Sequence, residues 1–382
     1  MKVRCVYKET CIFEPYAIRM RSKSLFMYNT LTILLYATFI HEIMKNGKAN
    51  LLPKITFIVP TLNAEAFLPS CLSSIRNQNY PQKQIEIIIA DGGSTDKTKL
   101  IAHNYSAKIL PNKRIYQEYG KTEASKKAKG SLLFYVDADN VLSTKNFVAS
   151  VVSVYLKHPE VMGFLPQTIP APDSNPIDRY LGYLFTDPFT WFIYKNSANP
   201  KDFHKAYKPL YSSSEYELYR FPKHRIPLFG LAQGVATNRQ FIRGTFDYAD
   251  DILSGIKLIR QGGIVAYIPK ATLYHYHIKN YGQFIQKYRW RVQNNFSKNI
   301  KDTGLVSRLS YLSSMQKFRI VLFLPYALSI VFPLIDSLLL TVRYRDKVML
   351  YHLIISYTLA WIIIIERIRN LFCPKPRIGH YR

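Results

Sequence analysis

The hydrophobic positions between residues 55 and 157 follow two different periodicities. Three short apolar runs lack the polar alternation of a half-exposed strand, which is typical of strands buried on both faces of a sheet. Around them, apolar residues recur at helical spacing. Strands that alternate with helices predict an α/β fold with a mostly parallel sheet flanked by helices. The strands are expected at 55–62, 85–91 and 131–139, and the helices at 64–78, after Ser94 or Thr95, and at 144–157.

Polar side chains follow each of these predicted strands. They are Thr61 and Asn63 after the first strand, Asp91 after the second, and Asp137 and Asp139 after the third. The carboxyl ends of parallel strands share one edge of a sheet, and ligands of open α/β sheets bind beyond that edge. The sequence therefore predicts a ligand site built from these acids and amides.

Asp137 and Asp139 are separated by a single residue, so in an extended chain they face the same side. Two carboxylates placed in this way repel each other unless they are protonated, paired or bound to a metal. Hard divalent cations take oxygen ligands and commonly bridge a carboxylate to the phosphates of a substrate. The pair therefore indicates Mg²⁺ or Mn²⁺ holding a diphosphate. Capping of the helix that follows is the alternative interpretation.

Two long apolar segments near the C-terminus, 320–341 and 348–365, are long enough to cross a bilayer. A short polar turn joins them, which predicts a transmembrane helical hairpin within a region 301–382 that ends in a basic tail. Basic residues outside both ends of the hairpin predict a multi-pass membrane protein with the rest of the chain in the cytoplasm. A pair of buried core helices is the alternative.

The first 50 residues form a basic segment with a weaker apolar stretch at about 24–43. A span at this point would put the preceding basic residues outside, against the positive-inside tendency. Three interpretations stay open. The stretch spans against the charge bias, it lies in the membrane interface, or the chain truly starts at Met20 or Met27, which removes most of the conflict.

The composition favours a polyanionic partner. Lys and Arg number 52 against 25 Asp and Glu, which gives a formal net charge of +27. Such an excess suits nucleic acid or anionic lipid headgroups. The apolar hairpin favours membrane lipids, and no nucleic-acid recognition motif is found, so no nucleic-acid partner is expected. The 4 cysteines lack the spacing of a zinc site or a disulfide framework.

The segment Ile55–Asn140 resembles the opening of family 2 glycosyltransferases, which have the GT-A fold. That family has a strand ending in P-[ST]-x-N, then a helix, then a strand ending in D-x-G-S-x-D. The stretch "GKTEASKKAKGSLLFYVDADN" is similar to the family's next block, which leads into its DxD motif. A moderate resemblance continues over 229–277. The matching residues of the first two motifs are Pro60, Thr61, Asn63, Asp91, Gly93, Ser94 and Asp96.

This resemblance implies an enzyme that uses a nucleotide-sugar donor and inverts the anomeric carbon. Asp139, with Asp137 in support, would bind the metal and the diphosphate, and Asp91 would contact the nucleotide base. In the family an acidic pair, usually Glu-Asp, opens a later helix, and its second member is the base. The residues implied in nucleotide-sugar binding are Pro60, Thr61, Asn63, Glu65, Asp91, Gly93, Ser94, Lys121, Asp137 and Ala138.

The acidic pair of this chain is Asp250 and Asp251. An inverting transfer needs a base beside the anomeric carbon, opposite the leaving diphosphate. Asp251 is therefore the expected base and Asp250 the substitute, although the first position departs from the family's usual Glu. Favourable placement of acids at a helix N-terminus is the alternative reason for the pair.

Three further segments are assigned to the acceptor or the membrane. The turn around Gly234 and Asn238 fits the acceptor side of the family. Gln286, Arg289 and Trp290 match the QxxRW motif of processive family 2 enzymes, in which it helps bind the diphosphate and the acceptor sugar. The helix at 281–298, with an apolar stripe, is predicted to lie on a membrane. The aromatic-rich segment 175–196 is either an interfacial lid or a core helix, and His275 and His277 are metal ligands, phosphate contacts or solvated.

The expected protein is thus a membrane-bound inverting glycosyltransferase with a catalytic domain at 51–300 facing the cytoplasm. Its expected partners are a nucleotide-sugar donor, a lipid-linked or glycan acceptor and membrane lipids, and its cofactor is Mg²⁺ or Mn²⁺. A processive polysaccharide synthase and an inactive basic membrane-binding protein are the alternatives. The sequence fixes neither the sugar nor the oligomeric state.

Overall fold

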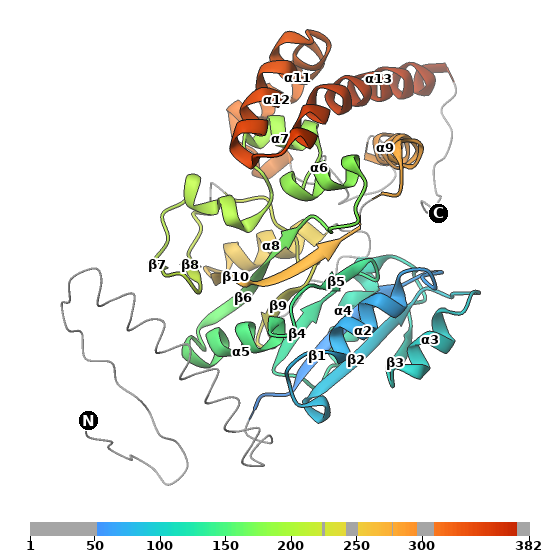
Figure 1. Cartoon of the computed structure of the whole chain (residues 1–382), viewed down its shortest axis with the longest axis vertical. Helices are drawn as coiled ribbons and strands as arrows, with labels where there is room; N and C mark the ends of the chain where they lie inside the picture. Colours follow the sequence, from blue (N-terminus) through green and yellow to red (C-terminus); the bar gives the residue numbers. More distant parts are fainter. Residues whose placement is uncertain (1–51, 224–225, 242–250, 277, 296–308, 373–382) are drawn as a thin grey trace, which may run out of the picture. The chain divides into compact units, whose positions relative to one another are not determined.

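The computed structural model describes residues 52–223, 226–241, 251–276, 278–295 and 309–372. The part Leu52–Arg382 is one compact unit. Its centre is a ten-stranded sheet in the order β3-β2-β1-β4-β9-β6-β10-β8-β7, with β5 paired to β10. Figure 1 shows this sheet with α2, α3, α4 and α5 beside its strands and the C-terminal helices above α6, α7 and α9.

The first half of the sheet is parallel, as the sequence predicts. β1 pairs with both β2 and β4, and β2 pairs with β3, all in parallel register. Residues of β1 and β2 are almost entirely buried, because helices cover both faces and leave no exposed position for polar alternation. The elements are β1 Ile55–Thr61, α2 Leu68–Arg76, β2 Ile85–Asp91, α3 Thr98–Asn104, β3 Lys108–Pro111, α4 Gln117–Lys127 and β4 Leu132–Tyr135.

The second half of the sheet is mixed. β9 runs antiparallel to β4 and β6, while β10 runs parallel to β6 and antiparallel to β5 and β8. The α/β class is confirmed, but "mostly parallel" holds only for the first half. The elements are β5 Asn140–Leu142, α5 Phe147–Lys157, β6 Val161–Ile169, β7 Tyr211–Ser212, β8 Glu217–Tyr219, β9 Val235–Asn238, α8 Asp251–Arg260 and β10 Ile264–His275.

Three helices connect the sheet to the C-terminal region, namely α6 (Pro176–Leu184), α7 (Pro188–Tyr194) and α9 (Tyr281–Asn295). Their aromatic and aliphatic side chains share one buried cluster with α11, α12 and α13. Within the segment 175–196, the core-helix alternative is therefore the observed one. The stripe of α9 formed by Phe284, Tyr288 and Val292 is also buried in this cluster, so it does not face a membrane as expected.

The described part of the C-terminal region forms three α-helices in place of the two straight spans predicted. Its elements are α11 (Ser314–Leu328), α12 (Val331–Tyr344) and α13 (Tyr351–Phe372). Among the described residues, one helix, Lys347–Phe372, is long and apolar enough to cross a membrane by itself. α11 and α12 reach that length only when they are taken together, and they are bent by 95° at their junction. Pro333 explains the break, because its ring excludes the carbonyl of Ser329 from a continuous helix. The described residues therefore do not support the multi-pass expectation.

Polar residues inside these apolar segments point into the protein. The Tyr326 hydroxyl donates to Asp336 Oδ2 at 2.7 Å, and both ring nitrogens of His352 contact tyrosine hydroxyls, those of Tyr180 and Tyr326. Lys195 of the aromatic-rich segment lies 3.3 Å from Asp336 Oδ2. These contacts join α6 and α7 to the C-terminal helices, which is why polar side chains are tolerated within them.

Candidate active site

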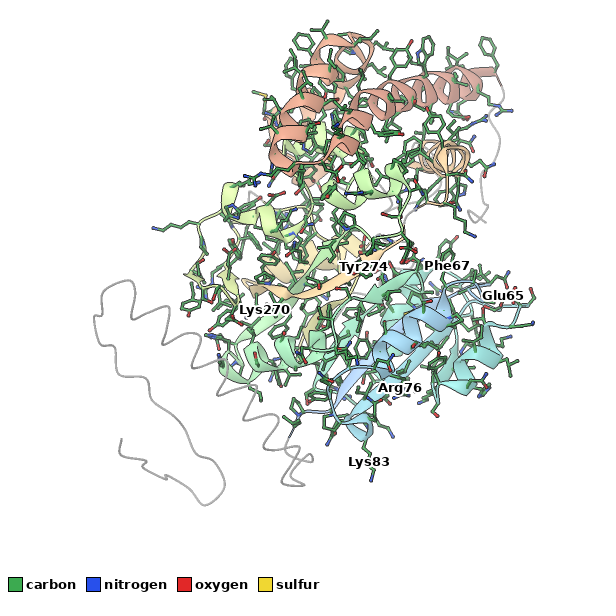
Figure 2. All side chains as sticks on the ribbon, in the orientation of Figure 1. Glu65, Phe67, Arg76, Lys83, Lys270 and Tyr274 are labelled. Atoms are coloured by element: carbon green, nitrogen blue, oxygen red, sulfur yellow. The ribbon has the colours of Figure 1, made fainter. Side chains whose placement is uncertain are left out.

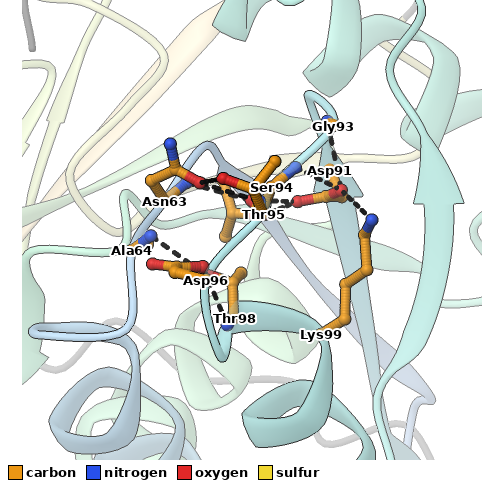
Figure 3. Close-up of polar contacts among 10 residues, drawn as sticks. Asn63, Ala64, Asp91, Gly93, Ser94, Thr95, Asp96, Thr98 and Lys99 are labelled. Carbon is orange, nitrogen blue, oxygen red and sulfur yellow. Dashed lines mark hydrogen bonds and ion pairs between the residues drawn. The ribbon is translucent and has the colours of Figure 1, made fainter.

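The carboxylate of Asp91 is fixed at the end of β2 by four hydrogen bonds. Oδ1 accepts from the hydroxyls of Thr61 at 3.2 Å and Ser94 at 2.5 Å, and Oδ2 accepts from the backbone N–H groups of Gly93 and Ser94. Lys99 Nζ lies 3.8 Å from Oδ2 (Figure 3). A buried carboxylate with these hydrogen bonds has one orientation, so its negative charge is fixed beside the loop that follows β2.

The loop after β1 is tied to the loop after β2. The amide oxygen of Asn63 accepts from the backbone N–H of Thr95, and the Asn63 backbone N–H donates to Ser94 Oγ at 2.9 Å (Figure 3). Asn63 has φ 50°, a left-handed conformation that Asn tolerates better than most residues. Glu65 Oε2 caps the Lys97 N–H at 3.0 Å. The structure thus brings these predicted binding residues together at one edge.

Figure 2 shows where this edge lies in the fold. Glu65 and Phe67 are at the carboxyl ends of the first strands, whereas Lys83, which precedes β2, is at the opposite end. Pro60 is buried in β1 and contributes backbone rather than a polar side chain. β2 and β4 flank β1, so Asp91 and the end of β4 are separated by two strand spacings, about 10 Å.

Asp137 lies just beyond β4, and its two carboxylate oxygens are engaged by the protein. Lys121 Nζ lies 3.0 Å from Oδ1, and Gln233 Nε2 donates to Oδ2 at 2.9 Å. The Lys121 side chain is fully buried and also contacts Glu118 Oε1 at 3.1 Å. Asp137 is therefore a fixed acceptor that joins α4, the β4 end and the turn before β9. A direct bond from Asp137 to a metal stays a prediction.

Asp139 faces His275 at the end of β10. Asp139 Oδ2 lies 3.5 Å from His275 Nε2, and Asn140 Nδ2 donates to Oδ1 at 3.2 Å. Ala138 forms the turn between the two acids. Burial on its own would raise the pKa of Asp139, but the nearby His275 and Lys287 outweigh it and lower that pKa below its usual value. Asp139 is therefore ionised at neutral pH.

The donor atoms at this position suit a divalent cation. A carboxylate oxygen and an imidazole nitrogen face each other from different elements, and both are ligands that Mn²⁺ accepts. The described residues contain no group of three or more His, Cys, Asp or Glu side chains arranged for a metal. Asp139 and His275 would therefore fit an ion that takes its remaining ligands from outside the protein, rather than a closed structural site.

Asp251 opens α8 and packs against Gly230. A Cβ at position 230 would lie 2.0 Å from Asp251 Oδ2, and the Leu231 N–H donates to the Asp251 backbone oxygen at 3.1 Å. Glycine is required here by this contact, because φ of Gly230 is outside the left-handed region. Asp250 lies outside the described residues. Its substitute role as base stays a prediction.

The two residues assigned to the acceptor turn separate in the structure. Gly234 has φ 77°, donates its N–H to the Tyr135 oxygen at 2.7 Å and lies beside Gln233, the partner of Asp137. Asn238 pairs with Leu132, at the amino end of β4. The side-chain oxygen of Asn238 accepts a hydrogen bond from the backbone N–H of Gln240. The structure therefore brings Gly234 to the site and leaves Asn238 at the opposite edge of the sheet.

The helix α9 presents different faces to the site and to α13. Arg289 Nε contacts Glu366 Oε1 at 2.9 Å, and Gln293 Nε2 donates to Oε2 at 2.6 Å. Lys287, two residues before Arg289, acts electrostatically on Asp139. Burial lowers the pKa of Lys287 to about 8. Gln286 and Trp290 also lie on α9, and the diphosphate or acceptor role of all three motif residues stays a prediction.

Sequence reasoning missed several residues of this site. His275 was left among three interpretations, Lys287 was placed only within a basic helix predicted to lie on a membrane, and neither Gln233 nor Gly230 was singled out. The positions of these residues in the site depend on how strands pair. β10 pairs with β5 so that His275 lies opposite Asn140, and this brings His275 to the DxD turn. The position of one residue relative to a strand far away in the sequence cannot be read from local spacing.

Comparison with known proteins agrees with this geometry. The family model described as Glycosyl transferase family 2 matches residues 56–209. A Methanococcus voltae dolichyl N-acetyl-alpha-D-glucosaminyl phosphate 3-beta-D-2,3-diacetamido-2,3-dideoxy-beta-D-glucuronosyltransferase is 33% identical over 108 residues, which are 26% of this chain and 33% of the relative. The O-antigen chain rhamnosyltransferase RfbN of Salmonella typhimurium is 25% identical over 254 residues, 62% of this chain and 70% of the relative.

Among solved structures, the mannosyltransferase PcManGT from Pyrobaculum calidifontis, in complex with GDP-Man and Mn²⁺, is similar with a TM-score of 0.47 and 17% identity. That similarity covers 85% of this chain and 88% of the other. The chain thus spans a third of the first curated relative and most of this structure. The match to glycosyl transferase family 2 thus covers residues 56–209, the part of the chain whose motifs lie at one sheet edge.

Proposed function

We propose that this protein is a membrane-bound inverting glycosyltransferase that moves a sugar from a nucleotide-sugar donor to a lipid-linked or glycan acceptor. The observation that carries the proposal is the convergence of Asp91, Asp137, Asp139 and His275 at one edge of the sheet. Three acids from two strand ends, with a histidine from a third strand, suit a nucleotide on one side and a diphosphate on the other. The metal-bearing relative supports a divalent cation, Mg²⁺ or Mn²⁺.

The residues divide the reaction among them. The fixed carboxylate of Asp91 lies where the nucleotide base would be held, and Asp139 and His275 would hold the ion, which neutralises the diphosphate as it leaves. Lys287 adds a positive charge beside the same acids. Asp251, held against Gly230, would take the proton of the acceptor hydroxyl as the new bond forms on the face opposite the diphosphate.

Two features support a lipid-linked acceptor. A groove of about 680 Å³ lies between α9 and α13, within the size range of ligand sites. Its walls are apolar between a polar contact at Tyr281 and Thr358 and the ion pair of Arg289 with Glu366. A hydrocarbon chain suits such walls. Because Arg289 is engaged by Glu366, the geometry does not favour the processive alternative.

The proposal is tested by incubating the purified full-length protein with a panel of nucleotide sugars, with Mn²⁺, with Mg²⁺ or with a chelator. Donor turnover is expected with a divalent ion and not with the chelator, and the transferred sugar should show an inverted anomeric configuration by NMR. Asp251→Asn should keep donor affinity and lose at least 100-fold in transfer. Glu123→Gln, which changes an exposed acid paired to Lys126, is the matched control. Turnover that ignores the chelator would contradict the proposal.

A further inference from the structure

The C-terminal helices expose more apolar surface than a helix packed in a soluble domain would. α11, α12 and α13 carry most of the large exposed hydrophobic residues of the described chain, including Val342 at 77% and Leu371 at 79% exposure. Contiguous apolar surface of this kind marks an interaction site. These helices could either cross a bilayer or lie in one leaflet. The inference below rests on the membrane association proposed above.

The exposed apolar residues of α13 follow one stripe, which starts at Leu350 just before the helix. The opposite face of the helix, including His352, Ile355, Leu359 and Glu366, is buried against the protein as far as Glu366, and the last six residues of α13 are exposed all round. A helix of 22 residues is about 33 Å long, which is enough to cross a bilayer. The stripe consists of Leu350, Ile354, Tyr357, Trp361, Ile365, Ile368, Leu371 and Phe372.

The second half of α13 lies beside α9, which limits how α13 can meet a membrane. Tyr281 contacts Thr358, and Arg289 contacts Glu366, so α9 is held against α13 at two points. If α13 crossed the bilayer, α9 would be carried to hydrocarbon depth with its cations Lys287, Arg289 and Arg291. Each charge there costs roughly 3 kcal/mol, and the catalytic edge next to Lys287 would follow.

Neither α11 nor α12 is long enough to cross a bilayer on its own. They contain 15 and 14 residues, so each is about 22 Å long, shorter than the hydrocarbon core of about 30 Å. Because of the 95° bend, the pair could cross only as a broken span in which both helices are steeply tilted from the membrane normal. At the bend, Ile330 has φ 62° and is exposed, together with Val331 and Phe332. Ile330 also lines the groove on α13, which places this apolar vertex next to the exposed stripe.

We infer that α11, α12 and α13 bind a single leaflet of an anionic bilayer, with α13 in the plane of the membrane and both of its ends on the side of the catalytic edge. The exposed stripe then lies among the acyl chains, and the buried face holds α9 and the site at headgroup level. Charge complementarity favours anionic lipid: Arg345 and Lys347 precede α13, Arg367 and Arg369 lie in its last turns, and the chain carries +27 in total.

Sidedness tests the inference in the full-length protein reconstituted into vesicles of phosphatidylcholine and phosphatidylglycerol. Cys5, Cys11 and Cys373, which lie outside the described residues, are changed to serine, and buried Cys71 is kept. Single cysteines are then placed at Lys347→Cys and Asn370→Cys, the two ends of α13, and at Lys83→Cys on the catalytic domain. A membrane-impermeant maleimide should label all three to the same fraction. If one end of α13 were labelled only in those molecules in which the other end is protected, the two ends would lie on opposite sides of the bilayer, and the inference would be overturned.

Depth measurement provides a second test that does not depend on orientation. A fluorophore on Ile354→Cys, Trp361→Cys or Ile368→Cys is quenched by lipids brominated at different chain depths. In-plane binding predicts the same shallow depth at all three positions. A crossing helix predicts the greatest depth at Trp361→Cys. These positions are exposed in the protein, so the changes should not disturb folding.

The outcomes separate the two proposals. If the protein pellets with vesicles but the depth profile peaks at position 361, the inference fails while membrane association stands. If the full-length protein does not bind vesicles of either composition, phosphatidylcholine alone or mixed with phosphatidylglycerol, both fail. Metal-dependent donor turnover is measured on the same preparation, because its presence or absence reports on the enzyme rather than on its topology.

Discussion

The contact between Gly230 and Asp251 gives a direct test of the proposed base. In Gly230→Ala, the new methyl group would lie 2.0 Å from Asp251 Oδ2 and 2.3 Å from its Cγ. Ordinary contacts of a Cβ are at least 3.4 Å, so the carboxylate must move by more than 1 Å or the backbone must shift. Displacing a catalytic group by about 1 Å costs on the order of 100-fold in rate.

The assay compares transfer to an acceptor with donor binding in wild type and Gly230→Ala. We expect kcat for transfer to fall roughly 100-fold while the donor Kd stays within about twofold, because Asp251 does not hold the donor. Gly182→Ala is the matched control, since a Cβ there makes an ordinary contact of 3.4 Å with Pro170. Thermal unfolding of each variant checks that the fold persists.

A double variant isolates the route of this effect. If Gly230 acts through Asp251, then Gly230→Ala combined with Asp251→Asn should be no slower than Asp251→Asn alone. Fully additive losses would show that position 230 affects the reaction independently of the base. Unchanged transfer in Gly230→Ala would refute the placement of Asp251 as a positioned base.

Three further predictions concern other parts of the chain. Lys121→Met should lower the free energy of unfolding by about 3–5 kcal/mol in denaturant titration, because it leaves Asp137 and Glu118 buried without their cation, and a loss under 1 kcal/mol would contradict this. The pKa of Asp202 is lowered to about 2: burial opposes the shift, but Lys205 and Arg343 outweigh it. At pH values above the pKa that Asp202 has in the unfolded chain, its ionised carboxylate therefore stabilises the fold by on the order of 2 kcal/mol. This stabilisation is lost as the pH falls through about 2, so Asp202→Asn should destabilise the protein less in acid than at neutral pH. Trp361→Glu in the apolar groove should reduce transfer to lipid-linked acceptors at least tenfold and leave donor turnover unchanged, and equal effects on both would argue against an acceptor site there.

The parallel half of the fold was predictable because its signals are local. β2 was expected at 85–91 and lies at Ile85–Asp91. A short run of aliphatic residues is buried most readily as a central strand, so the run itself marks the position of the strand. β9 and the strand pairs of β10 were not predicted, because antiparallel partners far away in the sequence leave no periodic mark. The helix after β2 was expected from Ser94 or Thr95, but those residues hold Asp91 and Asn63, and α3 begins at Thr98.

The C-terminal prediction failed for a different reason. Hydropathy counted residues 320–341 as one span, yet Pro333 breaks the helix and Asp336 turns inward to Tyr326 and Lys195. Likewise, the stripe of α9 around Phe284 was assigned to a membrane although it packs against other helices. An apolar face shows that a partner exists, but its sequence does not distinguish a lipid from a neighbouring helix.

The most direct measurement of the central claim is calorimetric binding of UDP and GDP, each with and without Mn²⁺, to the wild type, Asp139→Asn, His275→Ala and the control Glu123→Gln. If Asp139 and His275 hold the ion of a metal–diphosphate, at least one nucleotide should bind wild type and Glu123→Gln far more tightly with Mn²⁺. That enhancement should fall at least tenfold in both site variants. Equal enhancement by Mn²⁺ in all four proteins would contradict the assignment of this sheet edge as the donor site.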